Sequence, residues 1–146
     1  MSSEAQLQIS LKINKSGTSG NLNYQSYPTQ FTSDVDGALG PTPGAFLVSV
    51  DGTDVDLSQL TTPGLCRLSN QDGNNFVTYG LKDPVTNKFY PLGELLPGEF
   101  YVLRLSRVLG WGYSGSGTGT SGDDVNKLHF IADIDPCVVL VEAFEA

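Results

Sequence analysis

The segment near the C-terminus that decides the fold reads Lys127-Leu-His-Phe-Ile-Ala-Asp-Ile-Asp-Pro-Cys-Val-Val-Leu-Val-Glu-Ala-Phe144. Two short, mainly apolar stretches, 127–132 and 137–144, flank the sequence Asp133-Ile-Asp-Pro136. Short apolar runs bounded by turn-forming residues are typical of β-strands, and aspartate and proline are typical of turns. The segment therefore predicts two strands joined by a turn.

The remainder of the chain repeats this pattern of short strands and turns. Further strands are expected near residues 7–13, 45–50, 53–57, 65–68, 76–81, 88–92 and 99–105. No window of about 11 residues has helical periodicity, although 58–60 and 92–96 each have room for one helical turn. About eight to ten short strands with Gly, Pro and Asn between them predict an all-β fold. We expect a single antiparallel β-sandwich or a jelly-roll-like barrel.

The length of 146 residues predicts one domain in two parts. In residues 1–44, Leu7, Ile9, Leu11 and Ile13 alternate with polar residues, which indicates a half-buried strand. Residues 21–44 are rich in Ser, Thr, Gly, Pro and Asn, so we expect an extended arm or loop with at most one short strand. The core sandwich is expected in residues 45–146.

Charge and cysteine content exclude several classes of partner. The chain has 16 acidic and 8 basic residues and a formal net charge of −8. It therefore lacks the surplus of cations that nucleic acids or anionic membranes attract, and we expect neither partner. The sequence contains no transmembrane run and no signal peptide. Cys66 and Cys137 lie among apolar residues and are expected to be buried free thiols.

A glycine-rich stretch, residues 110–124, contains the pattern Gly-x-Gly-x-x-Gly twice. A dinucleotide site needs a strand before this pattern and a helix after it. The residues after Gly115 are Ser, Gly and Thr, which do not sustain a helix, because each glycine costs about 1 kcal/mol relative to alanine. We therefore expect a Gly/Ser-rich loop after the strand 99–105 and no bound nucleotide or other cofactor.

Candidate catalytic groups are few. The only histidine, His129, lies in the strand 127–132 on the face opposite Leu128 and Phe130. Such a position favours a surface or interface residue over a catalytic base. A pair of carboxylates for glycoside hydrolysis is not excluded, because the sequence does not give the distance between them. In the absence of a better signal, the candidates are Glu94, Glu99, Asp123 and Asp124. We predict no catalytic residues and no enzyme.

Acidic residues near two turns raise the question of calcium. Asp34-Val-Asp-Gly37 and Asp51-Gly-Thr-Asp-Val-Asp56 both offer oxygen ligands. Neither fits the twelve-residue calcium loop, which needs alternating acids, a glycine and a closing glutamate. Turn formation by itself accounts for an Asp-Gly pair. We therefore predict no metal site.

Aromatic residues supply the interface candidates. Trp111 and Tyr113 flank Gly112 at the start of the glycine-rich stretch, where they would contact a glycan or a protein, or else plug the end of the sandwich. Tyr24, Tyr27 and Phe31 lie in the N-terminal segment, which would pack on a neighbouring subunit or on its own barrel. With His129, these residues are the candidate interface residues.

The middle of the chain carries a succession of short motifs. They are Val55-Asp-Leu-Ser-Gln-Leu60, Pro63-Gly-Leu-Cys-Arg-Leu-Ser-Asn-Gln-Asp72, Asn75-Phe-Val-Thr-Tyr-Gly80, Phe89-Tyr-Pro-Leu92 and Leu96-Pro-Gly-Glu-Phe-Tyr-Val-Leu-Arg-Leu105. The succession resembles a group of small β-rich structural proteins of tailed bacteriophages over residues 45–144. The motifs have architectural roles: Asn70 and Asp72 suit a turn, and Pro97-Gly98 suits a tight reversal before a strand.

The resemblance implies a virion component. We expect a capsid decoration or cement protein that packs on the major capsid protein and forms a homo-oligomer, with a trimer preferred. The expected location is the virion, assembled in the host cytoplasm. A phage tail or neck protein, or a receptor-binding module that recognises a surface glycan through Trp111 and Tyr113, is the alternative. The glycine-rich insertion departs from the group's pattern.

Overall fold

The structure is a computed structural model that describes residues 5–33, 39–106, 109, 112–114, 118–120 and 127–146. For residues 112–114 and 118–120 it describes only the backbone. In these residues every regular element is a β-strand and every strand pair is antiparallel. The expected all-β, antiparallel class is therefore confirmed. The chain forms two compact parts, unit 1 (residues 1–36) and unit 2 (37–146).

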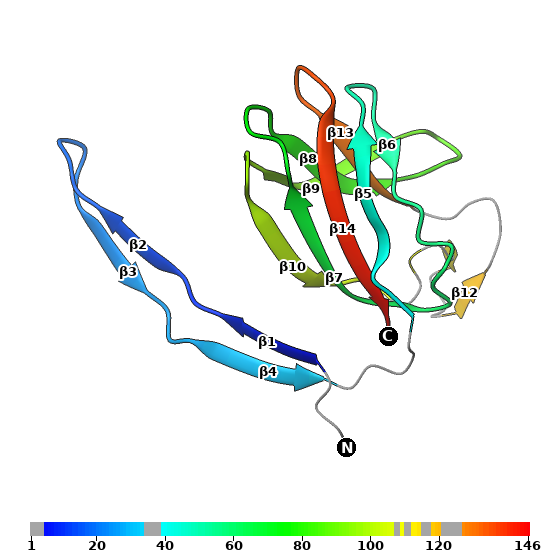
Figure 1. Cartoon of the computed structure of the whole chain (residues 1–146), viewed down its shortest axis with the longest axis horizontal. Coiled ribbons are helices and arrows are strands. Elements are labelled where there is room, and N and C mark those ends of the chain that lie inside the picture. Colours follow the sequence, from blue (N-terminus) through cyan, green and yellow to red (C-terminus); the bar gives the residue numbers. More distant parts are fainter. Residues whose placement is uncertain (1–4, 34–38, 107–108, 110–111, 115–117, 121–126) are drawn as a thin grey trace. The chain divides into compact units, whose positions relative to one another are not determined.

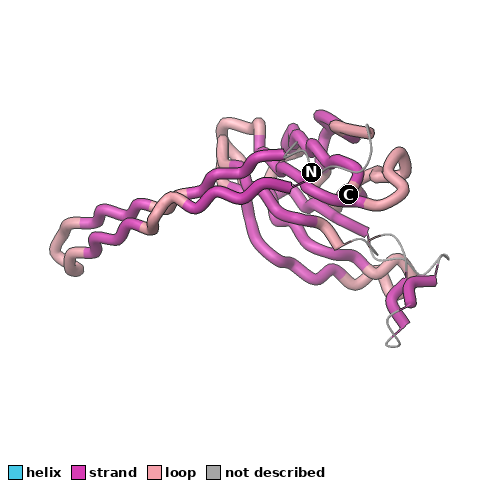
Figure 2. The backbone as a smooth tube through the Cα atoms, turned by 90° about the horizontal axis from the view of Figure 1, so that it is seen from below, coloured by secondary structure: helices cyan, strands magenta, loops and turns pink. Residues whose placement is uncertain are grey.

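Unit 1 contains two short antiparallel ladders (Figure 1), which are joined end to end as one hairpin (Figure 2). β1 (Ala5–Ile9) pairs with β4 (Thr29–Ser33), and β2 (Lys12–Lys15) pairs with β3 (Leu22–Gln25). Between the ladders, the N–H of Leu11 donates to Ser26 Oγ at 2.7 Å, and the N–H of Ser26 donates to the Leu11 carbonyl at 2.8 Å. Residues 5–33 are called the N-terminal ribbon below.

Residues 21–44 differ from the expected long loop. They form β3, β4 and the beginning of β5, and the single strand expected at 7–13 is divided between β1 and β2. The cause is strand pairing, because each strand of the ribbon forms backbone hydrogen bonds with the antiparallel strand opposite it. Tyr, Thr and Phe in this segment also favour extended backbone.

Unit 2 contains two four-stranded sheets (Figure 1) and one short ladder. The first sheet has the order β10-β7-β14-β5, with β5 Thr42–Val48, β7 Pro63–Asn70, β10 Phe100–Arg104 and β14 Cys137–Glu145. The second has the order β6-β13-β8-β9, with β6 Thr53–Asp54, β8 Val77–Lys82, β9 Phe89–Leu95 and β13 Lys127–Ala132. β11 (Gly112–Ser114) pairs with β12 (Thr118–Thr120).

The two strands expected at the C-terminus are inner strands of different sheets. β13 lies between β6 and β8, and β14 lies between β7 and β5. The turn at 133–136 therefore takes the chain from one sheet to the other. In β14, Cys137, Val139 and Val141 are buried while Val138 is exposed, as the period-two geometry of a strand requires. Both expected strands are confirmed.

Side chains from both sheets form one hydrophobic cluster. Val48 and Leu68 come from the first sheet, and Val77 and Phe130 come from the second, and all four are fully buried. The Phe46 and Phe130 rings meet edge to face at a centroid distance of 6.1 Å. Burial of each such side chain stabilises the fold by about 1.5–3 kcal/mol, so this cluster is the main source of stability in unit 2.

Two turns expected from the sequence are present. The N–H of Glu99 donates to the Leu96 carbonyl at 2.9 Å, so Pro97 and Gly98 occupy the centre of the reversal before β10. Gly98 has a φ of 77°, a conformation that glycine adopts without strain. Asn70 and Asp72 both accept hydrogen bonds from nearby backbone, Asn70 from the N–H of Asp72 and Asp72 from Asn74 and Asn75.

Three segments differ from what local composition suggests. Thr53 and Asp54 do not pair with the neighbouring strand β5 and instead, as β6, pair with β13 in the other sheet. Residues 92–95 belong to β9 and form no helical turn. The expected Gly/Ser-rich loop contains the β11–β12 ladder. The partner of β6 is distant in sequence, whereas β9 pairs with the preceding strand β8 and β11 pairs with β12 a few residues away. Local composition does not reveal which of these pairings forms.

Candidate interaction surfaces

The N-terminal ribbon has one apolar and one polar face in each ladder. Leu7 lies opposite Phe31 in the first ladder, whereas Gln8 lies opposite Gln30 on the other face. Successive strand residues point to opposite faces, so Ile9 lies on the same face as Leu7. This face therefore gathers the predicted interface residue Phe31 with two aliphatic side chains.

The second ladder repeats the arrangement. Ile13 lies opposite Tyr24, and Lys15 lies opposite Leu22, while Asn14 lies opposite Asn23 on the other face. The apolar side chains are largely exposed: Ile9 is 52%, Leu22 51%, Tyr24 52% and Phe31 44% exposed. We call these four, with Leu7 and Ile13, the apolar ribbon residues.

Tyr27, the remaining aromatic interface candidate of the ribbon, lies between β3 and β4 and is 91% exposed. Its carbonyl accepts a hydrogen bond from the Thr29 hydroxyl at 3.3 Å, so its backbone takes part in the connection between the strands. Its side chain is the most exposed large hydrophobic in the described part of the chain.

The side chains of the other two aromatic candidates, Trp111 and Tyr113, are not among those the structure describes. Trp111 lies outside the described residues. Tyr113 lies in the middle of β11, opposite Gly119 of β12, and its backbone alone is described. Their contact with a glycan therefore remains a prediction.

His129 is buried, and the expectation of a surface position is wrong. Its side chain is 3% exposed, although it lies on the opposite face of β13 from Leu128 and Phe130. That face is covered because β6 brings Asp54 to it, with His129 Nδ1 2.7 Å from Asp54 Oδ1. The Phe89 ring also meets the imidazole edge to face at 5.3 Å. In this chain His129 is a packing residue and no longer an exposed interface candidate.

An outer patch on the first sheet was not foreseen. Leu47 and Val138 lie opposite each other on β5 and β14, and they are 61% and 42% exposed. Phe100 of β10 faces the same side and is 62% exposed. An Arg67–Glu142 salt bridge of 2.7 Å lies on the same face beyond Phe100, and the Arg67 guanidinium carbon is 5.0 Å from the Phe100 ring centroid. The apolar run at 137–144 predicts a strand, but it gives no signal of which alternate residues remain uncovered.

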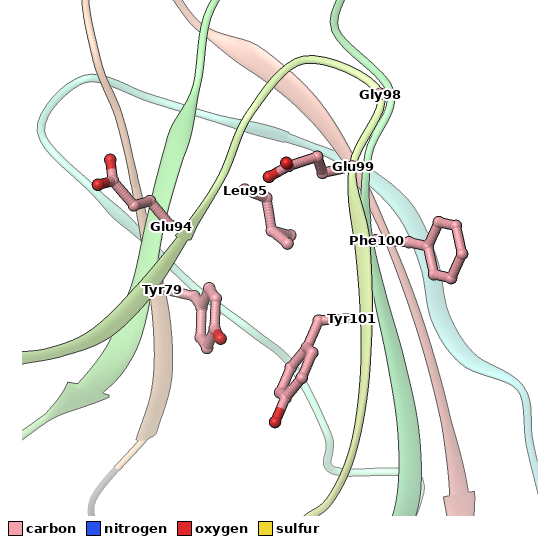
Figure 3. Close-up of a pocket in the computed structure, with 7 residues that line it drawn as sticks. All are labelled: Tyr79, Glu94, Leu95, Gly98, Glu99, Phe100 and Tyr101. Atoms are coloured by element: carbon pink, nitrogen blue, oxygen red, sulfur yellow. The ribbon is translucent and has the colours of Figure 1, made fainter. Parts of the chain in front are cut away.

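A pocket of about 400 Å³ lies where the turn between β9 and β10 approaches β8 (Figure 3). Its lining residues are Tyr79, Glu94, Leu95, Gly98, Glu99, Phe100 and Tyr101. The rings of Tyr79 and Tyr101 are nearly parallel, with centroids 6.3 Å apart and 24° between their planes. Two strands of different sheets thus present a pair of aromatic rings to one opening.

Local structure explains how Tyr79 reaches this position. β9 has a glycine opposite Tyr79, and a Cβ atom on Gly93 would lie only 2.6 Å from the Tyr79 hydroxyl oxygen. The register of β8 and β9 also shifts between Tyr79 and Gly80. Burial raises the pKa of Tyr79, and the neighbouring Tyr101 adds to the shift, so the phenol is neutral at physiological pH.

The two carboxylates of the pocket were named from the sequence only as default candidates for glycoside chemistry. The structure places both Glu94 and Glu99 at this pocket, whereas Asp123 and Asp124 lie outside the described residues. Glu99 Oε2 accepts the N–H of Leu96 at 2.8 Å, which ties it to the turn that contains Pro97. Tyr79 and Tyr101 were not recognised as a pair, because their neighbourhood depends on two separate sheets.

The cysteines and the acidic turns have structural roles. Cys66 and Cys137 are buried free thiols, as expected. Burial raises the pKa of the Cys66 thiol to about 12, with a smaller effect from Glu142, and burial also raises the pKa of Cys137. Asp54, once considered for calcium, lies against His129 and 3.7 Å from Lys127 Nζ. Of the other acids considered for calcium, Asp51 is exposed, and Asp56 Oδ1 accepts the N–H of Ser58 at 3.0 Å. Asp34 and Asp36 lie outside the described residues.

The described residues contain no group of three or more His, Cys, Asp or Glu side chains arranged to hold a metal ion. Nor does that part of the chain form a helix with the length and apolar character needed to cross a membrane. Comparison with protein-family models, curated proteins and solved structures found no match.

Proposed function

We propose that this chain is a non-enzymatic structural protein of a virus particle. In this proposal it is a capsid decoration or cement protein that packs on the major capsid protein and on copies of itself, as a homo-oligomer with a trimer preferred. The particle would be assembled in the host cytoplasm. The proposal rests on the resemblance of residues 45–144 to structural proteins of tailed phages and on the exposed surfaces described above.

The proposed architecture is a single antiparallel β-sandwich, or a jelly-roll-like barrel, with a long N-terminal arm and a Gly/Ser-rich loop. Its support is the common cluster to which both four-stranded sheets of unit 2 contribute buried side chains. Aligned sheets that share such a layer of side chains are the defining feature of sandwiches. The arm in this proposal is the N-terminal ribbon.

The observation that carries the proposal is the apolar face of the N-terminal ribbon. A two-stranded hairpin is only marginally stable in water unless a further layer covers its hydrophobic face. Four of the apolar ribbon residues, Ile9, Leu22, Tyr24 and Phe31, remain between 44% and 52% exposed. A ribbon of this kind suits a protein whose arm is covered by a neighbour in an assembly.

The energetic scale is compatible with such an assembly. Burying one fully exposed large apolar side chain contributes about 1.5–3 kcal/mol, and a side chain that is already half-buried contributes about half of that. The apolar ribbon residues together therefore reach the lower part of the cost of association, which is about 4–15 kcal/mol. In a closed symmetric oligomer each copy both supplies and receives a ribbon, so the contact forms once for every subunit.

The test is the copy number of this chain in purified virus particles. Quantitative mass spectrometry of intact virions should find it in numbers comparable with those of the major capsid protein. Particles that contain only a few copies would contradict the decoration role and favour a tail or neck position. Absence of the chain from purified virions would overturn the proposal as a whole.

A further inference from the structure

We propose that the pocket between Tyr79 and Tyr101 binds a positively charged side chain, arginine or lysine, that a partner protein presents. The inference goes beyond the proposed function and does not depend on it, because every residue involved belongs to unit 2. Four observations support it: the shape of the pocket, its aromatic pair, its two carboxylates without a salt bridge to the described residues, and the cations that already lie over two other exposed rings.

The shape suits a side chain inserted from outside. The pocket volume of about 400 Å³ lies in the range of sites that hold small ligands, about 300–1,000 Å³. In Figure 3 the rings of Tyr79 and Tyr101 face each other across the opening, while Phe100 points away from them. Tyr101 is 49% exposed, so an incoming group can reach its ring.

The pocket carries two carboxylates. Glu94 and Glu99 line it, and neither forms a salt bridge with a lysine or arginine of the described residues. Glu99 also accepts the Leu96 N–H within the turn. With a net charge of −8 on the whole chain, the surrounding field also favours a cation.

The rings strengthen this preference. The face of an aromatic ring carries partial negative charge and attracts a cation within about 6 Å of its centroid. The chain already uses this interaction twice, with Lys88 Nζ 5.1 Å from the Tyr90 centroid and the Arg67 guanidinium carbon 5.0 Å from the Phe100 centroid. Among the described residues no cation lies over Tyr79 or Tyr101. Tyr79 also packs against Phe130, with centroids 6.2 Å apart, so the exposed Tyr101 ring is the one that a partner's cation reaches first.

A neutral sugar fits the pocket less well than a cation does. Sugars also stack on tyrosine, but a neutral ligand would gain nothing from the two carboxylates that line the pocket. An ammonium or guanidinium group would gain from their charge, because hydrogen bonds between ionised groups are the stronger ones. The combination of two rings and two acids therefore favours a cationic side chain.

The experiment is an NMR titration of the full chain with a short blocked peptide that contains one arginine. The control peptide contains citrulline, which has the same shape as arginine and no charge. We expect saturable shifts of the Tyr79 and Tyr101 ring signals with the arginine peptide, and shifts at least threefold smaller with citrulline. Equal shifts with both peptides, or no saturable shift in the millimolar range, would overturn the proposal.

Variants identify the site. Tyr101→Leu and Glu94→Gln should each weaken binding of the arginine peptide by about 3- to 10-fold, the range expected from one cation–π or one charge contact. Tyr90→Leu is the matched control, because Lys88 already covers that ring, and it should leave binding unchanged. Glu94 is exposed, so its variant remains informative even if Tyr101→Leu folds poorly. Unchanged binding in Glu94→Gln contradicts the proposal.

A sugar arm distinguishes the alternative ligand class. The same ring signals are followed during titration with the neutral methyl glycosides of glucose, galactose and N-acetylglucosamine. We expect no saturable shift. Saturable shifts of Tyr79 and Tyr101 with a glycoside, together with none from the arginine peptide, would replace the cationic side chain with a glycan as the ligand of this pocket.

Discussion

At the scale of single residues, Asn70 joins two turns and two sheets of unit 2. Its side chain is 1% exposed, and Nδ2 donates to the carbonyls of Asn75 at 2.8 Å and Leu95 at 3.1 Å. Its Oδ1 accepts the N–H of Asp72 at 2.9 Å. One buried amide thus satisfies three backbone groups, of which the Leu95 carbonyl is buried and the other two are part-buried.

We expect Asn70→Ala to lower the free energy of unfolding by about 2–4 kcal/mol, because it leaves buried carbonyl and N–H groups without partners. Urea unfolding followed by circular dichroism measures this change. Asn74→Ala is the matched control, since Asn74 is exposed, and it should change stability by less than about 0.5 kcal/mol. A loss as small as that of the control would show that Asn70 is not a structural centre.

The Asp72 carboxylate is expected to make the stability of the fold depend on pH in the acidic range. Its Oδ1 accepts the N–H groups of Asn74 and Asn75 at 2.7 Å each, and these backbone hydrogen bonds, that of Asn75 foremost, hold the pKa of Asp72 below its ordinary value of 3.8. Because the folded pKa is lower than the unfolded one, the stabilisation is present above 3.8 and is lost as pH falls through the folded pKa.

Asp72→Asn keeps the accepting oxygen and removes the titration. The free energy of unfolding of the wild type should therefore fall more steeply than that of the variant between about pH 5 and about pH 2. Urea unfolding at a series of pH values in this range checks the prediction. Identical slopes for the two proteins would mean that the Asp72 turn contributes nothing to acid sensitivity.

Residue roles differ in how well the sequence predicts them. Asn70 and Asp72 were assigned correctly to a turn, because they bond to backbone only a few residues away. His129 was placed on the surface, because strand periodicity says only which face it occupies. Whether that face is covered depends on Asp54 and Phe89, which reach it from two other strands of the same sheet.

At the scale of elements, the N-terminal ribbon is the feature that most needs a partner. Its two ladders carry apolar side chains on one face and glutamine or asparagine on the other. A period-two pattern of this kind normally marks the side of a sheet that is packed against another layer. The strands that complete each ladder come from the segment expected to be mostly loop.

We expect the double variant Tyr24→Ser with Phe31→Ser to shift the chain towards monomer, because it removes two exposed aromatic side chains from the apolar face. Sedimentation velocity over a range of concentrations measures the shift. The control is Gln8→Ser with Gln30→Ser, which alters the opposite face of the same ribbon and should leave association unchanged. If both variants associate like the wild type, the ribbon is not the site of self-association.

At the scale of the whole molecule, unit 2 has a hydrophobic core of its own. All the residues of the buried cluster, from Val48 to Ala143, belong to it. A unit with its own core normally folds alone. Unit 1 contributes no side chain to that cluster, so the two units are expected to differ greatly in intrinsic stability.

Removal of residues 1–36 should therefore leave a cooperatively folded unit 2. Its urea midpoint and near-ultraviolet circular dichroism should match those of the full chain. The same truncated protein should fail to join purified particles if the N-terminal ribbon provides the contact. Loss of cooperative unfolding after truncation would instead show that the core of unit 2 requires the ribbon.

The sequence by itself determined the all-β class, the strands 127–132 and 137–144, the turn at Pro97-Gly98 and the buried cysteines. These features depend on period-two patterns and on turn chemistry, which act over a few residues. The tertiary structure alone decided the partner of β6, the burial of His129, the division of the N-terminal segment into paired strands, and the meeting of Tyr79 with Tyr101. Strand pairing and sheet contact join residues far apart in the chain, and no local pattern records which distant segment will satisfy a given strand.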